Sequence, residues 1–137
     1  MQVLCDTSFL MVIVSKPVKN VERIEREFGR LDFVVPDVVV DELRRLEEKA
    51  GPKRSRLART ALEISRSRFK VVAVPRAAHV DDSIVEHATR EKCAVATIDT
   101  ALRRRLIASK VLVLTLSRDR LTVANPKMAG RWSDRLK

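Results

Sequence analysis

Hydrophobic residues in this chain fall into short apolar runs, which alternate with longer segments of helical periodicity. The runs consist of consecutive Val, Ala, Leu and Cys with few polar residues between them, which is typical of strands buried on both faces of a parallel sheet. We expect five such strands, at residues 3–5, 33–35, 71–74, 93–97 and 111–114. A short apolar segment at 121–123 is a candidate for an additional edge strand.

Between these runs, apolar residues recur at helical spacing. Val39, Leu43 and Leu46, for example, share one side of a helix that Pro36 and Asp37 open. Strands that alternate with helices predict parallel pairing with right-handed crossovers. The expected fold class is therefore α/β, a three-layer α/β/α sandwich with a central, mostly parallel five-stranded sheet. We expect one domain over residues 1–124 and a basic C-terminal tail over 125–137.

Two of the predicted strands end on an acidic residue. Asp6 follows the first strand and Asp99 follows the fourth. Glu42 lies in the helix after the second strand, and Asp81 opens the helix after the third. Ligands of open parallel sheets collect beyond the carboxyl ends of the strands, so all four acids are expected to converge there.

Each acid also has a simpler interpretation when it is taken alone. Most acidic side chains are solvated surface groups. Asp81 would serve as a helix N-cap, and Glu42 would pair with a cation on its own helix. The joint placement of the four favours a shared site. Asp82 leaves open which of two neighbouring acids points inward, and the three-residue spacing to Ile84 favours Asp81.

Carboxylates at close range repel one another unless a counter-charge lies between them. Mg²⁺ or Mn²⁺ accepts oxygen ligands and suits a site of few carboxylates plus a substrate phosphate. One or two such ions can activate water and stabilise the leaving oxygen of a phosphodiester. Thr7, Ser8, Thr97 and Asp82 are the candidates to orient the metal-binding acids from a second layer.

The charge balance indicates a polyanionic partner. The chain of 137 residues carries a net charge of +10 and has a pI of about 10.4, which favours nucleic-acid binding over a merely solvated basic surface. Arg44 and Arg45 follow Glu42, and Arg103, Arg104 and Arg105 follow Asp99, so these five are candidate phosphate contacts. A further basic stripe would guide RNA at a distance from the chemistry, at Lys53, Arg54, Arg56 and Arg59.

Other features narrow the class of protein. No apolar run approaches the roughly 18 residues of a membrane span, and the N-terminus lacks signal-peptide features, so we expect a cytoplasmic protein with no membrane partner. Cys5 and Cys93 are too few for a disulfide framework, and we expect both to be unpaired and buried. Arg outnumbers Lys, Tyr is absent and Gly is scarce, a composition similar to that of thermophile proteins.

Four motifs around the acids resemble those of PIN-domain ribonucleases, and the resemblance covers about residues 2 to 123. The motifs are Asp6-Thr7-Ser8-Phe9-Leu10, the segment from Pro36 to Glu42-Leu43, Asp81 three positions before Ile84, and Ala96-Thr97-Ile98-Asp99. The resemblance implies an endoribonuclease that depends on Mg²⁺ or Mn²⁺ and leaves a 5′-phosphate and a 3′-hydroxyl. It also implies a common tendency to form homodimers.

Within this family, residues 92–99 together with Leu102 to Arg105 look most like the archaeal and eukaryotic branch that cleaves pre-rRNA. That branch would imply ribosome-assembly factors as partners. The related VapC-type toxins, which are of similar length, would imply an antitoxin. Many relatives carry a further Asp where this chain has Ala101, and often an Asn where it has Ser8. Ala101 leaves open the number of metal ions and the alternative of a non-catalytic RNA-binding protein.

Overall fold

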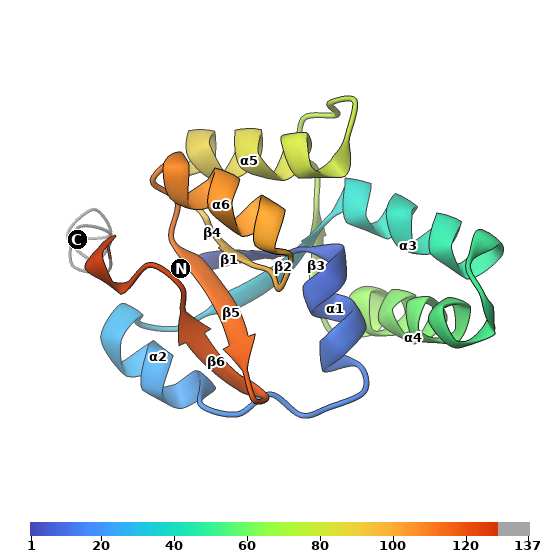
Figure 1. Cartoon of the computed structure of the whole chain (residues 1–137), viewed down its shortest axis with the longest axis horizontal. Helices are drawn as coiled ribbons and strands as arrows, with labels where there is room; N and C mark the ends of the chain where they lie inside the picture. The colour runs from blue at the N-terminus through green and yellow to red at the C-terminus, as the bar shows by residue number, and fades with distance from the viewer. Residues whose placement is uncertain (129–137) are drawn as a thin grey trace.

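Six strands form one sheet in the order β3-β2-β1-β4-β5-β6 in the computed structural model of the chain, which describes residues 1–128 (Figure 1). The first five strands are parallel to their neighbours, and β6 runs antiparallel to β5. The expected α/β sheet is confirmed, but it has six strands, because the candidate edge segment pairs with β5. The strands are β1 (Gln2–Cys5), β2 (Asp32–Pro36), β3 (Lys70–Val72), β4 (Ala94–Ala96), β5 (Val113–Ser117) and β6 (Arg120–Val123).

Helices connect the parallel strands and enclose the sheet between two layers. Figure 1 shows α5 and α6 on one side of the strands and α2 and α4 on the other. The chain passes from β3 to β4 across β1, so the strand order reverses between β1 and β4. The helices are α1 (Thr7–Ile13), α2 (Val21–Phe28), α3 (Asp37–Lys49), α4 (Pro52–Ser67), α5 (Val80–Glu91) and α6 (Thr100–Ala108), with a short 3₁₀ helix, η1 (Pro126–Met128).

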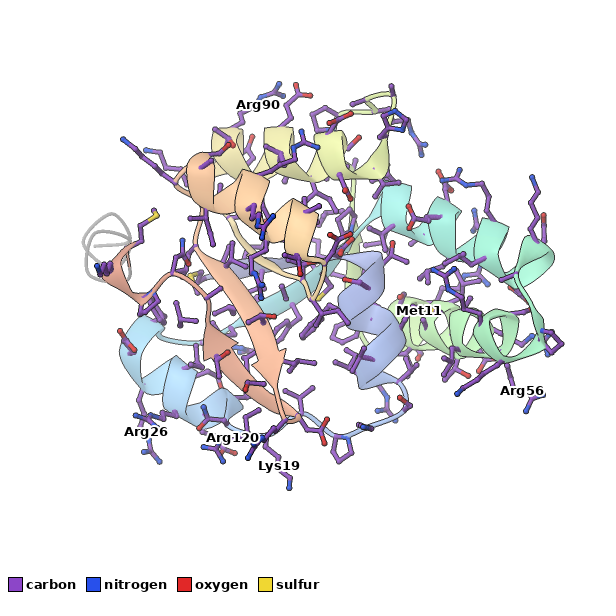
Figure 2. All side chains as sticks on the ribbon, in the orientation of Figure 1. Met11, Lys19, Arg26, Arg56, Arg90 and Arg120 are labelled. Carbon is purple, nitrogen blue, oxygen red and sulfur yellow. The ribbon has the colours of Figure 1, made fainter. Side chains whose placement is uncertain are left out.

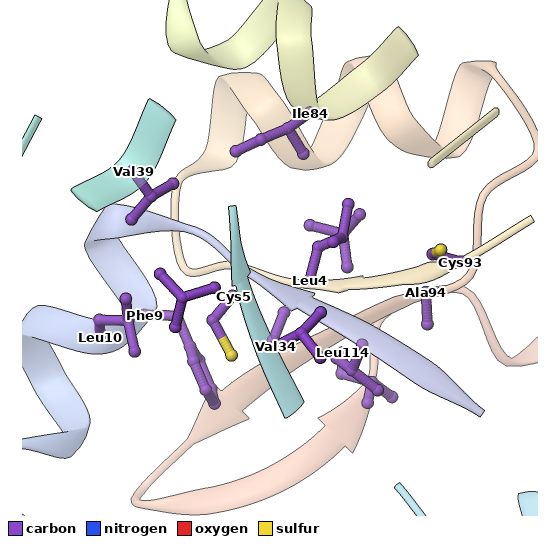
Figure 3. Close-up of a cluster of buried hydrophobic side chains, with 14 of the residues drawn as sticks. Leu4, Cys5, Phe9, Leu10, Val34, Val39, Ile84, Cys93, Ala94 and Leu114 are labelled. Carbon is purple, nitrogen blue, oxygen red and sulfur yellow. The ribbon is translucent and has the colours of Figure 1, made fainter. Parts of the chain in front are cut away.

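The core is built on the two faces of the central strand. Successive side chains of a strand point to opposite faces. Figure 3 shows Leu4 directed toward Ile84 of α5, while Cys5 lies on the other side near Phe9. All four are at most 2% exposed. Burial and, to a smaller extent, the neighbouring Asp6 raise the pKa of the Cys5 thiol, so it stays protonated. Cys5 and Cys93 are both free and buried, as expected.

Several element boundaries differ from those expected. Strand β3 begins and ends earlier, and β5 begins later and extends to Ser117. Helix α5 begins at Val80 with His79 as its N-cap, so Asp81 lies in the first helical turn and the simple capping interpretation is wrong. Asn125 accepts a hydrogen bond from Val113 N (3.0 Å) and donates to Val111 O (2.8 Å), so the first residue of the expected tail is anchored to the sheet. The remainder of that tail from residue 129 lies outside the described residues.

No helix in residues 1–128 is both long enough and apolar enough to cross a membrane.

Candidate active site

Asp6 is held in one orientation at the end of the central strand. Its backbone N–H donates to Ala96 O (3.0 Å) and continues the pairing of β1 with β4. Its Oδ1 accepts the N–H of Thr7 (2.7 Å), and its Oδ2 accepts the hydroxyls of Ser8 (2.7 Å) and Thr97 (2.8 Å). Asp6 is only 4% exposed, so these three hydrogen bonds compensate the lost hydration of a buried carboxylate.

Asp99 occupies the equivalent position after β4, as the N-cap of α6. Its Oδ1 accepts the N–H groups of Ala101 (2.9 Å) and Leu102 (3.1 Å), as expected of an Asp that begins a helix. Its Oδ2 has no hydrogen-bond donor among residues 1–128. Thr97 connects the two acids, because its hydroxyl donates to Asp6 and accepts the N–H of Asp99 (3.0 Å).

Glu42 of α3 and Asp81 of α5 complete the set, as the strand order leads one to expect. These two carboxylates line one pocket together with Asp6 and Asp99. The acidic pocket, as we call it, has a volume of about 310 Å³, and its lining consists of Asp6, Thr7, Ser8, Met11, Val12, Glu42, Arg54, Asp81, Ile98 and Asp99. Glu42 has no hydrogen bond or ion pair within the described part of the chain, so it does not make the cation pair of the simpler interpretation.

The acids of the pocket interact electrostatically. Partial burial raises the pKa of the Asp81 carboxyl above its ordinary value, and the negative charges of Asp6, Asp99 and Glu42 raise it further. The guanidinium of Arg105 acts in the opposite direction. Asp82 instead pairs with Arg105 (Oδ1 to Nη2, 2.7 Å) and is not part of the pocket lining. Of the two neighbouring acids, the structure thus directs Asp81 to the pocket.

The chemistry of these donors fits a hard divalent cation. All four acids offer oxygen, and a positive charge between them would relieve the repulsion that raises the pKa of Asp81. The Thr7 hydroxyl is also buried without a hydrogen-bond partner in residues 1–128. Over the same residues, no three Asp, Glu, His or Cys side chains are grouped so that they could hold an ion directly. Mg²⁺ suits such a wider arrangement, because it retains several of its waters when few carboxylates bind it.

The predicted RNA-binding arginines are placed differently from one another. Arg44 pairs with Asp41 (3.5 Å) and Arg105 with Asp82. Arg103 and Arg104 extend from α6 and have no ion pair in the described residues, and Arg45 lines a second hollow next to the acidic pocket.

Arg54 lies closer to the acids than the sequence suggested. It lines the acidic pocket itself and does not belong to a remote basic stripe. The turn at Gly51-Pro52, which folds α4 back against α3, is the sequence signal that could have placed it there. Arg59 of the same expected stripe pairs with Glu47 (3.2 Å).

A parallel sheet whose strand order reverses at two acid-terminated strands defines an α/β protein with an anionic site at the carboxyl edge. The chain belongs to the family of PIN-like domains, whose family model matches residues 3–120. This confirms the resemblance seen in the four sequence motifs. No curated protein gives a match.

Several solved structures share the fold. The PIN domain endonuclease Utp24 is 24% identical, with a TM-score of 0.69 over 90% of each chain. VapBC2 from Rickettsia felis, solved with a DNA fragment from its promoter, is 15% identical, with a TM-score of 0.61 over 85% of this chain and 100% of that one. PAE2754 from Pyrobaculum aerophilum is 14% identical, with a TM-score of 0.53 over 98% and 99%.

Proposed function

We propose that this protein is a metal-dependent endoribonuclease whose active site is the acidic pocket. The observation that carries the proposal is the convergence of Asp6, Glu42, Asp81 and Asp99 on one pocket. Burial, together with the charges of the other three acids, raises the pKa of Asp81 there. Such an arrangement disfavours full ionisation without a cation and is typical of functional sites. The net charge of +10 supports a polyanionic substrate, and the resemblance of the four motifs to PIN-domain ribonucleases supports cleavage of RNA.

The four acids would hold one or two Mg²⁺ or Mn²⁺ ions, in part through waters that the ions retain, and the ions would supply an activated water and neutralise the leaving oxygen of the phosphodiester. Asp6 has the most restricted side chain, because Thr7, Ser8 and Thr97 all donate to it. Asp99 would contribute the oxygen that its helix cap leaves free.

Arginines around the pocket would bind the RNA phosphates. Arg54 is the candidate beside the acids, and Arg103 and Arg104 are candidates on α6. Arg44 and Arg105 are engaged by carboxylates and would contribute mainly by their charge, while Asp82 would position Arg105. Arg45 lines the neighbouring hollow and is a further candidate for a phosphate contact.

The test is cleavage of a labelled single-stranded RNA over a titration of MnCl₂. We expect no cleavage in EDTA, cleavage with Mn²⁺, and a loss of more than about 100-fold in Asp99→Asn and Asp81→Asn, since even outer-layer groups of metal sites contribute about 10- to 100-fold. Glu27→Gln, an exposed acid of α2, is the matched control and should keep full activity.

A second measurement does not depend on activity. Mn²⁺ should raise the midpoint of thermal unfolding of the wild type, because an ion that binds only the folded state stabilises it, and should raise that of Asp99→Asn much less. Cleavage without metal, or full activity in both Asn variants, would contradict the proposal.

One observation favours a second candidate function, a non-catalytic RNA-binding protein. Ala101 stands exposed in the first turn of α6, so no fifth carboxylate faces the pocket from that position. This alternative predicts RNA binding that weakens steeply with salt, and no cleavage with any divalent ion.

The biological role follows the relatives. The resemblance of residues 92–99 and Leu102 to Arg105 to the pre-rRNA-cleaving branch supports pre-rRNA processing with ribosome-assembly factors as partners, and we favour this role, in the cytoplasm. The fold shared with the endonuclease Utp24 is consistent with it. The likeness to VapBC2 supports the toxin of a toxin–antitoxin pair, with an antitoxin as partner. Toxicity on expression that Asp6→Asn relieves would favour the toxin. We further propose a homodimer, which a sedimentation experiment would detect.

A further inference from the structure

A second hollow adjoins the acidic pocket and shares with it only one of the proposed metal-binding acids, Glu42. It lies between α3 and the segment 76–80 that leads into α5, with a volume of about 240 Å³. We call it the α3–α5 hollow, and its polar lining consists of Asp41, Glu42, Arg45, Arg76, His79 and Ser83. Glu42 lines both this hollow and the acidic pocket, so the two share a wall. A polymer that lies across the acids can therefore extend directly into the hollow.

The charges of the hollow leave one guanidinium available. Arg76 is held by Asp41 (2.8 Å) and Asp37 (3.7 Å), and Asp41 also contacts Arg44 (3.5 Å). The negative charge of Asp41 is thereby offset within the protein. Arg45, in contrast, has no ion pair or hydrogen bond in residues 1–128, although it lies one helical turn from Glu42. An unpaired Arg on the wall of a hollow is suited to a phosphate, which it can contact with two N–H groups.

The size and lining of the hollow suit one small group. The exposed residues Ala77 and Ala78 and the buried residues Val38 and Ser83 also line it. Ser83 Oγ accepts the N–H of Ala77 (2.9 Å), which fixes this segment in place. The volume of about 240 Å³ is below the roughly 300–1,000 Å³ of pockets for drug-sized ligands, so the hollow has room for no more than about one nucleotide unit. His79 is exposed at the rim and offers an imidazole face on which a base can stack.

We propose that the α3–α5 hollow binds one nucleotide of a single-stranded RNA, next to the phosphate in the acidic pocket, with Arg45 at its phosphate and His79 against its base. The inference rests on the proposed function, because RNA that is cleaved in the acidic pocket would have to pass Glu42 to reach the hollow. It adds a subsite that would select the nucleotide beside the cut.

The experiment measures binding without cleavage. The probe is a fluorescein-labelled eight-nucleotide oligo(U) in EDTA, followed by anisotropy over a range of KCl. We expect Arg45→Ala to weaken binding by about fivefold or more and to reduce the salt slope by about 0.7, the loss of one phosphate contact on a single strand. Arg26→Ala removes the same charge from α2, well away from α3 in Figure 2, and should change binding by less than about twofold.

Two further variants separate shape from charge. Ala78→Trp fills the hollow without a change of charge and should weaken binding about as much as Arg45→Ala does. His79→Ala should alter the ranking of oligo(U), oligo(A), oligo(C) and oligo(G). Ala78 and His79 are exposed, so both variants should fold, and thermal unfolding verifies this.

Equal binding by Arg45→Ala and Arg26→Ala, or unchanged binding by Ala78→Trp, would overturn the subsite. An unchanged ranking in His79→Ala would overturn the base contact. Because these measurements are made in EDTA, a failed cleavage assay with Mn²⁺ would contradict the proposed function and leave the subsite standing.

Discussion

The two ends of the central strand β1 open onto hollows of opposite character. At the carboxyl end, the acidic pocket of about 310 Å³ gathers four carboxylates. At the amino end, a larger hollow of about 650 Å³ gathers cations and partly buried Phe side chains, with one acid, Asp32, that pairs with Arg30 (3.3 Å). If volume alone decided, the hollow at the amino edge would be the better candidate for the functional site. The convergence of four buried or partly buried carboxylates selects the carboxyl edge, and this is the better sign of a site.

The largest expected difference between the edges concerns a single carboxylate. Asp6→Asn should reduce RNA cleavage by more than about 100-fold, because Asp6 accepts three hydrogen bonds and belongs to the acidic pocket. Asp32→Asn makes the same chemical change at the amino edge, where it removes only an exposed ion pair. Initial rates of cleavage with Mn²⁺ measure the effect of each variant. Equal rates for Asp6→Asn and Asp32→Asn would contradict the assignment of the site to the carboxyl edge.

The hydroxyl beneath the acids should have the next largest effect. Thr97→Val keeps the shape of a fully buried side chain but removes the donor to Asp6 and the acceptor for Asp99. We expect cleavage to fall by about 10- to 100-fold, because groups that orient metal ligands contribute that much. Thr89→Val, which alters an exposed Thr of α5, serves as the control and should leave cleavage unchanged. Wild-type cleavage by Thr97→Val would show that the acids need no orientation.

Two arginines at opposite ends of α4 sharpen the comparison further. Arg54 lines the acidic pocket and Arg68 lines the hollow at the amino edge. Arg54→Ala should weaken binding of single-stranded RNA by about fivefold, the loss of one close phosphate contact, and Arg68→Ala by less than about twofold. Dissociation constants of the RNA complexes, measured in EDTA, compare the two variants. A larger effect for Arg68→Ala would place the RNA at the amino edge of the sheet.

The smallest expected effect is on stability and depends on pH. The pKa of Asp81 is raised in the folded protein, so its carboxyl stabilises the fold at low pH and this contribution is lost as the pH rises through the folded pKa. At pH 7 without metal, Asp81→Asn should therefore raise the free energy of unfolding by up to about 1 kcal/mol, since solvent screens a half-exposed group. Urea unfolding at pH 7 and pH 4 measures this. A gain that does not shrink at the lower pH would contradict it.

The positions of Asp6 and Asp99 could be predicted from the sequence, because an apolar run that stops at an acid indicates both the strand and its end. The three-residue spacing to Ile84 favoured Asp81 over Asp82, and the structure agrees with that preference. Both acids lie in the first turn of α5, and Asp82 pairs with Arg105 of α6. That ion pair joins two helices, so the sequence around the two acids could not reveal it.

The sixth strand was also difficult to predict, for a reason in the backbone. The turn between β5 and β6 places Arg118 and Asp119 at φ values of 51° and 65°. Hairpin turns with two such residues usually carry Asn-Gly or Asp-Gly, and this chain has neither Asn nor Gly there. Pairing of β6 with β5 compensates a turn that the two residues themselves disfavour, so the strand was visible only as a short apolar segment.

The bond from the Asp6 amide to Ala96 O has a consequence for hydrogen exchange. This amide lies between the two central strands, beside a fully buried core, so it should exchange with deuterium only when the whole domain unfolds. The residue that begins the acidic pocket would then be among the slowest-exchanging of the chain. The site is anchored in the part of the molecule that thermal fluctuations open last.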